Sequence, residues 1–86
     1  MPLLATMREK ATEGDAQAVW RAAHAMRSSA SAIGASAVAQ RCVEIEVQAR
    51  DHGILPSGVV LAALNAELAA ASRELRELVD VDAPAA

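Results

Sequence analysis

The stretch Ala23-His24-Ala25-Met26-Arg27-Ser28-Ser29-Ala30-Ser31-Ala32-Ile33-Gly34-Ala35 decides how this chain folds. It is rich in alanine, the strongest helix former, and its glycine suits the left-handed position just past a helix end. A second helical pattern begins directly after the glycine, so the two helices should form an antiparallel hairpin. The stretch therefore predicts a helix that displays His24 and turns back at Gly34.

The helix that carries His24 is predicted over residues 15–33 and has two different faces. At about 100° per residue, one face is an apolar stripe that should pack on the core. His24 lies on the other face and should be exposed to water. The stripe consists of Val19, Ala22, Met26, Ala30 and Ile33, and the residues within roughly 60° of His24 are Gln17, Trp20, Arg21, Arg27, Ser28 and Ser31.

The remainder of the chain predicts three more helices, over residues 2–12, 35–51 and 58–79. Apolar stripes at helical spacing mark all three, and Glu46 should lie partly buried and paired at the edge of the third stripe. Asp15 and Ser57 are expected N-caps. The predicted fold is all-α, an up-down-up-down four-helix bundle with a short first helix over residues 1–79. Residues 80–86 carry no stripe and are expected to form a disordered tail.

Composition excludes several classes of function. The chain has 86 residues, enough for one small domain, and a formal net charge of −3, which implies no general affinity for nucleic acid. No apolar run is long enough for a membrane span, so we expect no direct membrane contact and a cytoplasmic location, although a longer parent protein could be anchored in a membrane. No Gly-rich phosphate loop and no metal-ligand spacing are present, and the single cysteine, Cys42, lies on a core stripe.

Charge is spread unevenly along the chain. Residues 16–43 contain three arginines and no acid, whereas all eleven acidic residues lie outside this segment. The surface around His24 should therefore be locally positive, which suits an acidic or phosphorylated partner site.

The chemistry best matched to His24 is reversible phosphoryl transfer. Near neutral pH, part of an imidazole population is unprotonated and nucleophilic, and the N–P bond that it forms stays labile. Arg27, one turn on, could neutralise the added negative charge. Ser28 and Ser31 are small and should leave the imidazole accessible. Each of these residues also has an ordinary structural interpretation: small residues serve helix–helix contacts, and Arg27 could be a solvated charge.

Trp20 is the only aromatic residue and allows two interpretations. It lies one turn before His24, where a partly exposed ring could anchor a partner. Alternatively, the short first helix could cover the ring and make it an edge of the core. Gln17 and Arg21 lie beside it and complete the predicted docking surface.

The central stretch resembles the signature of histidine-containing phosphotransfer (HPt) domains, which runs Ala-His-x-Leu-Lys-Gly-Ser-Ser, an apolar residue and Gly-Ala. Ala23-His24, Ser29-Ala30 and Ile33-Gly34-Ala35 match it. More loosely, Glu13-Gly14-Asp15 and Glu46…Arg50-Asp51 are similar to the family pattern. Arg27 stands where the family usually has Lys, and Ser28 where it usually has Gly.

The resemblance implies that His24 is the phosphorylated residue, in a domain without kinase activity of its own. The partner would be a response-regulator receiver domain, whose aspartate exchanges the phosphoryl group and which would hold the Mg²⁺. This chain would need no cofactor, and it could be the C-terminal domain of a hybrid sensor kinase. The short first helix also leaves one side open, where a weak homodimer could form.

A different class of function fits the same residues. The chain could be a small helical adaptor or dimerisation module, with an apolar surface that binds a partner and an incidental histidine.

Overall fold

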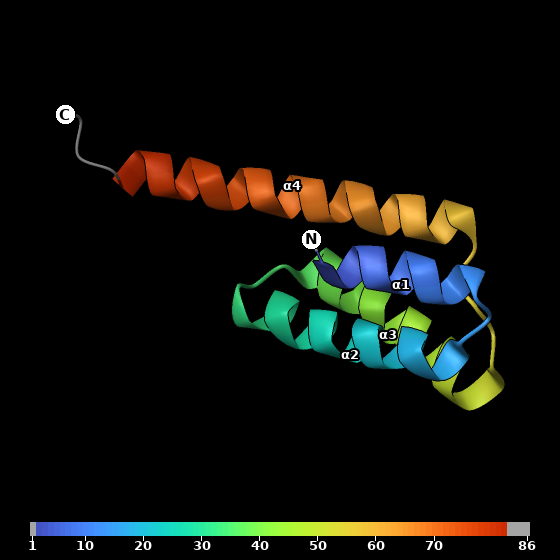
Figure 1. The fold of residues 1–86 in the computed structure, drawn as a ribbon. Helices are drawn as coiled ribbons and strands as arrows, with labels where there is room; N and C mark the ends of the chain where they lie inside the picture. The colour runs from blue at the N-terminus through green and yellow to red at the C-terminus, as the bar shows by residue number, and fades with distance from the viewer. Residues whose placement is uncertain (1, 83–86) are drawn as a thin grey trace.

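The computed structural model describes residues 2–82 and contains four helices. They are α1 (Pro2–Thr12), α2 (Ala16–Ala32), α3 (Ser36–His52) and α4 (Gly58–Asp82). Successive helices run in opposite directions, and α2 and α3 form a tight hairpin (Figure 1). The predicted all-α fold and up-down-up-down four-helix bundle are confirmed, and no strand occurs within residues 2–82.

The helix ends follow the local chemistry of the sequence. The Asp15 carboxylate accepts a hydrogen bond from the backbone N–H of Ala18 at 3.0 Å, and the Ser57 hydroxyl oxygen accepts one from that of Val60 at 3.2 Å. These bonds satisfy N–H groups that have no partner within their own helix. Gly34 has φ = 75°, a left-handed conformation that favours glycine, and it lies between the end of α2 and the start of α3.

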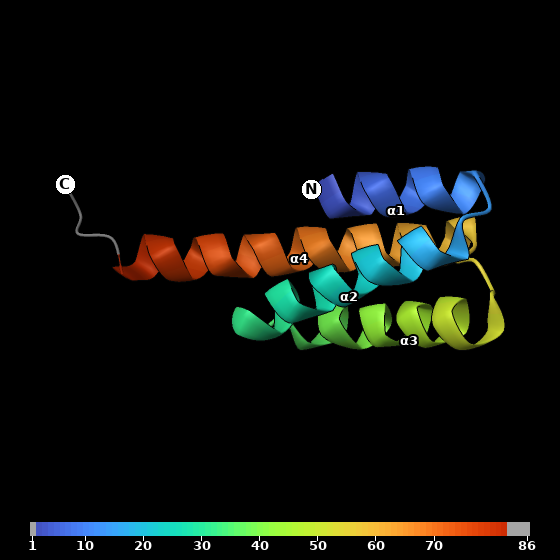
Figure 2. The ribbon, with the colours of Figure 1, turned by 60° about the horizontal axis from the view of Figure 1, so that its bottom comes forward.

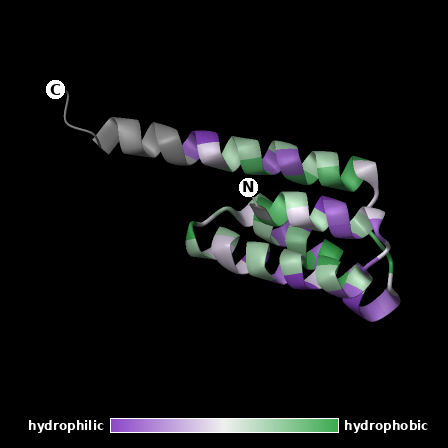
Figure 3. Ribbon diagram, viewed as in Figure 1, coloured by the Kyte–Doolittle hydropathy of each residue, from purple (hydrophilic) through white to green (hydrophobic). Residues whose placement is uncertain are grey.

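The core lies between the apolar faces of the helices (Figure 3). The stripes predicted for the first three helices supply most of it, and α4 adds Leu61 and Leu64. The buried apolar side chains of α2 and α3 are mostly alanine, valine and cysteine, which lets these two helices approach each other closely (Figure 2). Among the residues whose burial the structure describes, the buried apolar ones are Leu4, Met7, Val19, Ala22, Ala23, Met26, Ala30, Val38, Cys42, Ile45, Ala49, Leu61 and Leu64.

The predicted helix bounds lie within one residue of the observed ones except at the end of the last helix, and two of the differences affect the predicted core and tail. Ile33 was expected in the core but is 53% exposed, because α2 ends at Ala32 and Ile33 turns away in the connection to α3. The last helix continues through Asp82, three residues beyond the predicted end at Val79. The rest of the predicted tail, residues 83–86, lies outside the described residues.

The last helix is longer than the rest of the bundle. In both ribbon views its C-terminal part runs on past the α2–α3 turn (Figures 1 and 2). A hydrogen bond links α4 to the α2–α3 hairpin: Arg41 Nε of α3 donates to Glu67 Oε1 of α4 at 2.8 Å. A homodimer through the side left open by the short α1 stays a prediction. None of the described helices combines the length and apolar character that a membrane span requires.

Candidate functional site

His24 lies near the middle of α2, on the face that points away from the core. Its side chain is 52% exposed, whereas Ala23 and Met26 beside it are buried. The sequence predicted this orientation, because the apolar stripe of the helix occupies the opposite face. The imidazole is therefore open to an approaching molecule.

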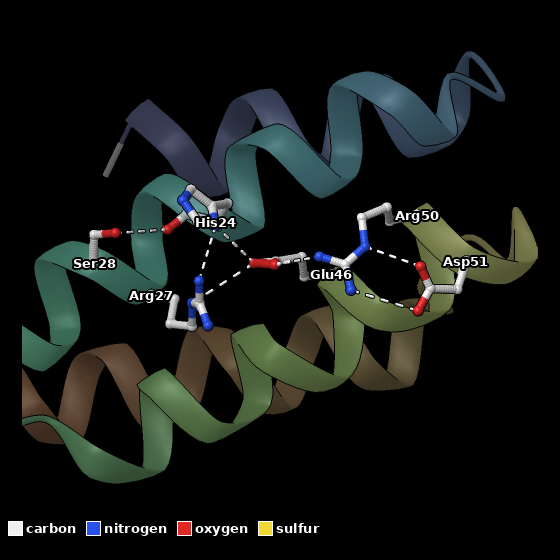
Figure 4. Close-up of polar contacts among 6 residues, drawn as sticks. All are labelled: His24, Arg27, Ser28, Glu46, Arg50 and Asp51. Atoms are coloured by element: carbon white, nitrogen blue, oxygen red, sulfur yellow. Dashed lines mark hydrogen bonds and ion pairs between the residues drawn. The ribbon is translucent and has the colours of Figure 1, made fainter.

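One partner of the His24 ring comes from the next helix. The side chain of Glu46 on α3 is only 5% exposed, and its Oε1 lies 3.0 Å from His24 Nδ1 (Figure 4). An ionised carboxylate is costly to bury unless cations and hydrogen-bond donors surround it. Glu46 is buried and paired, as its place at the edge of the stripe predicted, but the sequence did not show that His24 would be its partner.

Two groups compete for Nδ1 of His24. Arg27 Nη2 lies 2.9 Å from Nδ1, and Glu46 Oε1 lies 3.0 Å from the same nitrogen. A carboxylate can only accept a hydrogen bond, so the contact with Glu46 needs a proton on Nδ1. A guanidinium can only donate, so the contact with Arg27 needs a lone pair there. Only one of the two hydrogen bonds can exist at a time, and each selects a different tautomer of the ring.

The choice of tautomer decides whether the exposed nitrogen can react. With Nδ1–H donating to Glu46, Nε2 carries the lone pair of the neutral ring and is a nucleophile. With Nδ1 accepting from Arg27, the proton of the neutral ring moves to Nε2 and blocks attack. Within the described residues no hydrogen-bond partner faces Nε2. Glu46 therefore favours the reactive form of His24.

Arg27 also has a second acceptor. Its Nε lies 3.6 Å from Glu46 Oε1, so the guanidinium can pair with the carboxylate when Nδ1 is protonated. Its side chain is about one-third exposed, and it starts one helical turn from His24. From this position a rotation of the side chain could carry the charge to a group attached to Nε2.

The second oxygen of Glu46 faces a different cation. Arg50 Nη1 lies 3.3 Å from Glu46 Oε2, one turn along α3. Asp51 in turn accepts hydrogen bonds from Arg50 Nε at 2.9 Å and from Nη2 at 3.4 Å. This pairing raises the pKa of Arg50 and lowers the pKa of Asp51, in both cases mainly through the hydrogen bond between them. His24, Arg27, Glu46, Arg50 and Asp51 form one connected cluster, called here the His24 cluster (Figure 4).

A family model for the Hpt domain matches residues 1–74. This chain belongs to the Hpt domain family. No curated protein and no solved structure matches the chain. Hpt domains are phosphocarrier modules of two-component signalling, have no kinase activity of their own, and interact with receiver domains. The chain accordingly has a phosphotransfer role in two-component signalling.

The predicted access residues of this Hpt domain lie on α2, C-terminal to His24. Ser28 and Ser31 are exposed, and the Ser28 hydroxyl donates a hydrogen bond to the backbone carbonyl of His24 at 3.2 Å. That bond holds the hydroxyl against its own helix, one turn from the ring. Ser28 thus adds little bulk beyond the Gly that usually stands in this place.

The predicted docking residues lie on the same helix but outside the His24 cluster. Gln17 and Arg21 are exposed and line a shallow groove of about 350 Å³ between α1 and α2. Trp20 is half-buried and packs against the core, and the Arg21 guanidinium lies 5.9 Å from the centre of its ring. Trp20 therefore belongs at least partly to the core, in agreement with the interpretation of its ring as an edge of the core.

Sequence reasoning missed that Glu46, Arg50 and Asp51 join His24. The sequence did contain one signal for the contact between His24 and Glu46. In an antiparallel hairpin, residues at similar separations before and after the turn lie at the same level of the two helices. His24 lies ten residues before Gly34, and Glu46 lies twelve after it. In the described part of the chain, the His24 cluster included, no group of three or more His, Cys, Asp or Glu side chains could hold a metal ion.

Proposed function

We propose that His24 accepts a phosphoryl group from the aspartyl phosphate of a response-regulator receiver domain and can pass it to another receiver. The observation that carries this proposal is the contact of Nδ1 with the buried Glu46 carboxylate, which favours the neutral tautomer with the proton on Nδ1 and the lone pair on Nε2. In an imidazole without such a partner, no hydrogen bond fixes the proton on Nδ1.

The transfer step follows from this geometry. The Nε2 lone pair attacks the phosphorus, the N–P bond forms, and the P–O bond to the receiver aspartate breaks, which releases the carboxylate. Nε2 has no proton to lose. Nδ1 keeps its proton and donates it in the hydrogen bond to the Glu46 carboxylate, which stabilises the positive charge that the ring gains. The reverse step returns the phosphoryl group to an aspartate. Mg²⁺ would be bound by the receiver, and this chain would need no cofactor.

Arg27 stabilises the phosphorylated form in this proposal. Phosphorylation brings two negative charges next to the ring, and the guanidinium is the nearest cation that can turn toward them. Ser28 and Ser31 keep the approach open, whereas Gln17, Trp20 and Arg21 contact the receiver. The arginine-rich, acid-free segment over residues 16–43 matches the acidic phosphorylation site of such a partner. We place the domain in the cytoplasm, without nucleic acid or membrane contacts. It would act either alone or as the C-terminal domain of a hybrid sensor kinase.

A labelling experiment tests the proposal. Receiver domains charged with radioactive phosphate are mixed with the wild-type chain and with His24→Gln. We expect label to move to the wild type and not to the variant. His52→Gln is the matched control, because His52 is the other histidine and lies exposed at the end of α3. Label that persists in His24→Gln would contradict the proposal.

A further inference from the structure

The carboxylate of Glu46 has two cations, one at each oxygen. Arg27 Nε lies 3.6 Å from Oε1, and Arg50 Nη1 lies 3.3 Å from Oε2. Since the Glu46 side chain is only 5% exposed, water compensates little of its charge. The number of cations near this carboxylate therefore matters more than it would at the surface.

The Arg27 guanidinium cannot pair with Glu46 and with a phosphoryl group on His24 at the same time. When Nε2 carries the phosphoryl group, Arg27 has to turn away from Glu46 to reach the new charge. If Arg27 were the only cation at Glu46, this movement would leave a buried carboxylate with the His24 ring alone. Removing one partner of a buried ion pair is strongly unfavourable, so Arg27 would be held back.

Arg50 can stay paired with Glu46 before and after His24 is phosphorylated. It lies on α3, one turn from Glu46 on the same helix, so no movement of α2 disturbs the pair. Asp51 accepts hydrogen bonds from Nε and Nη2 of the Arg50 guanidinium, and Nη1 of the same group points toward Glu46 (Figure 4). Arg50 is thus fixed at both ends of its guanidinium group, whereas Arg27 has alternative acceptors.

We propose that Arg50 is a positioning residue for phosphoryl transfer, which balances the charge of Glu46 and so releases Arg27 to the phosphoryl group on His24. This inference rests on the proposed function and extends it to a residue that touches neither the ring nor the phosphoryl group. It assigns Asp51 the task of holding Arg50 in place.

The proposal predicts energetic coupling between Arg27 and Arg50. Four proteins, wild type, Arg27→Ala, Arg50→Ala and the double variant, are phosphorylated with phosphoramidate, a small donor that needs no receiver. We expect Arg27→Ala to slow labelling about 10-fold and Arg50→Ala about 5-fold, as suits the loss of charge-assisted contacts. In the Arg27→Ala background, Arg50→Ala should slow labelling less than about 2-fold, because no Arg27 remains to be released.

Several variants separate positioning from a merely structural role. Arg50→Lys keeps the cation one turn from Glu46 and should restore most of the rate. Arg41→Ala is the matched control, since it removes another α3 arginine with an ion pair, to Glu67, outside the His24 cluster. It should leave the labelling rate unchanged. Asp51→Asn weakens the grip on Arg50 without removing a buried charge, and it should slow labelling in the same direction even if Arg50→Ala does not fold.

The outcomes distinguish this inference from the proposed function. If the wild type takes up no label from phosphoramidate or from a receiver, both fail. If the wild type is labelled at His24 but the effects of Arg27→Ala and Arg50→Ala simply multiply, the role of Arg50 is overturned while the proposed function stands. An unchanged rate in Arg50→Ala, with unchanged helix content, would also overturn it.

Discussion

The Oε1 atom of Glu46 lies 3.0 Å from Nδ1 of His24, across the hairpin formed by α2 and α3. This contact joins a buried carboxylate to an exposed ring, so a group in the interior of the bundle favours a proton on Nδ1 of a surface residue. Every chemical property that we propose for His24 depends on it.

Glu46→Gln should slow phosphorylation of His24 about 10-fold. The amide oxygen can still accept from Nδ1–H, but a charge-assisted hydrogen bond is replaced by a neutral one, and about 1.4 kcal/mol corresponds to a factor of ten in rate. The rate of label uptake from a phosphorylated receiver measures this change. Glu44→Gln, an exposed neighbour on the same helix, is the control and should behave as the wild type. Equal rates for both variants would show that Glu46 has no influence on the ring.

Ser28 should matter through its size. Ser28→Leu places a bulky side chain one turn from His24 and should block the in-line approach of a receiver, whereas Ser28→Gly should be tolerated or should speed transfer. Both rates are measured with a phosphorylated receiver. Since phosphoramidate is small, Ser28→Leu should still be labelled by it. Normal transfer from a receiver to Ser28→Leu would refute the access argument.

Trp20→Ala should lower stability, because the ring is half-buried and packs on the core. Truncation of a fully buried aromatic residue costs about 3–5 kcal/mol, so roughly half that loss and a fall of several degrees in melting temperature are expected. Thermal unfolding followed by circular dichroism measures the change. Receiver affinity should be determined on the same variant. Undiminished affinity together with a large stability loss would remove Trp20 from the docking surface.

Cys42 should make stability fall at high pH. Burial, with smaller contributions from the charges of Glu67 and Glu46, raises the pKa of its thiol from 9.0 to about 11. Between these values the unfolded chain loses the thiol proton while the folded chain keeps it, so the free energy of unfolding decreases as pH rises. At pH 10 the loss should be about 1–2 kcal/mol.

Urea unfolding at pH 7.5 and pH 10 measures this loss. Cys42→Ala is the control, because alanine does not titrate and other groups affect both proteins alike. The wild type should lose more stability than Cys42→Ala between the two pH values. An equal loss would show that the thiol makes no contribution.

Much of the fold follows from local sequence chemistry. The caps at Asp15 and Ser57 and the left-handed glycine at Gly34 fix the helix ends, and each can be recognised without knowledge of the tertiary structure. The periodic stripes then predict which faces meet. Ile33 shows the limit of this reasoning, because it continues the stripe in sequence but lies beyond the last helical residue, where the wheel no longer applies.

The candidate site could be predicted only in part. The exposure of His24 and the burial of Glu46 follow from periodicity, since each depends on a single helix. Their contact depends on how far α2 and α3 are rotated about their axes and on the side-chain conformations, which a helical wheel does not contain. The same holds for Arg50, which reads as an ordinary solvated charge until Glu46 and Asp51 are placed beside it.

The position of the phosphoryl group on the imidazole tests the central claim most directly. The chain, labelled with ¹⁵N in its histidine rings, is phosphorylated with phosphoramidate and examined by ¹⁵N and ³¹P NMR. The account predicts a phosphoryl group on Nε2 of His24, with the proton retained on Nδ1, and an unmodified His52. A phosphoryl group on Nδ1 of His24, or on His52 instead, would contradict it.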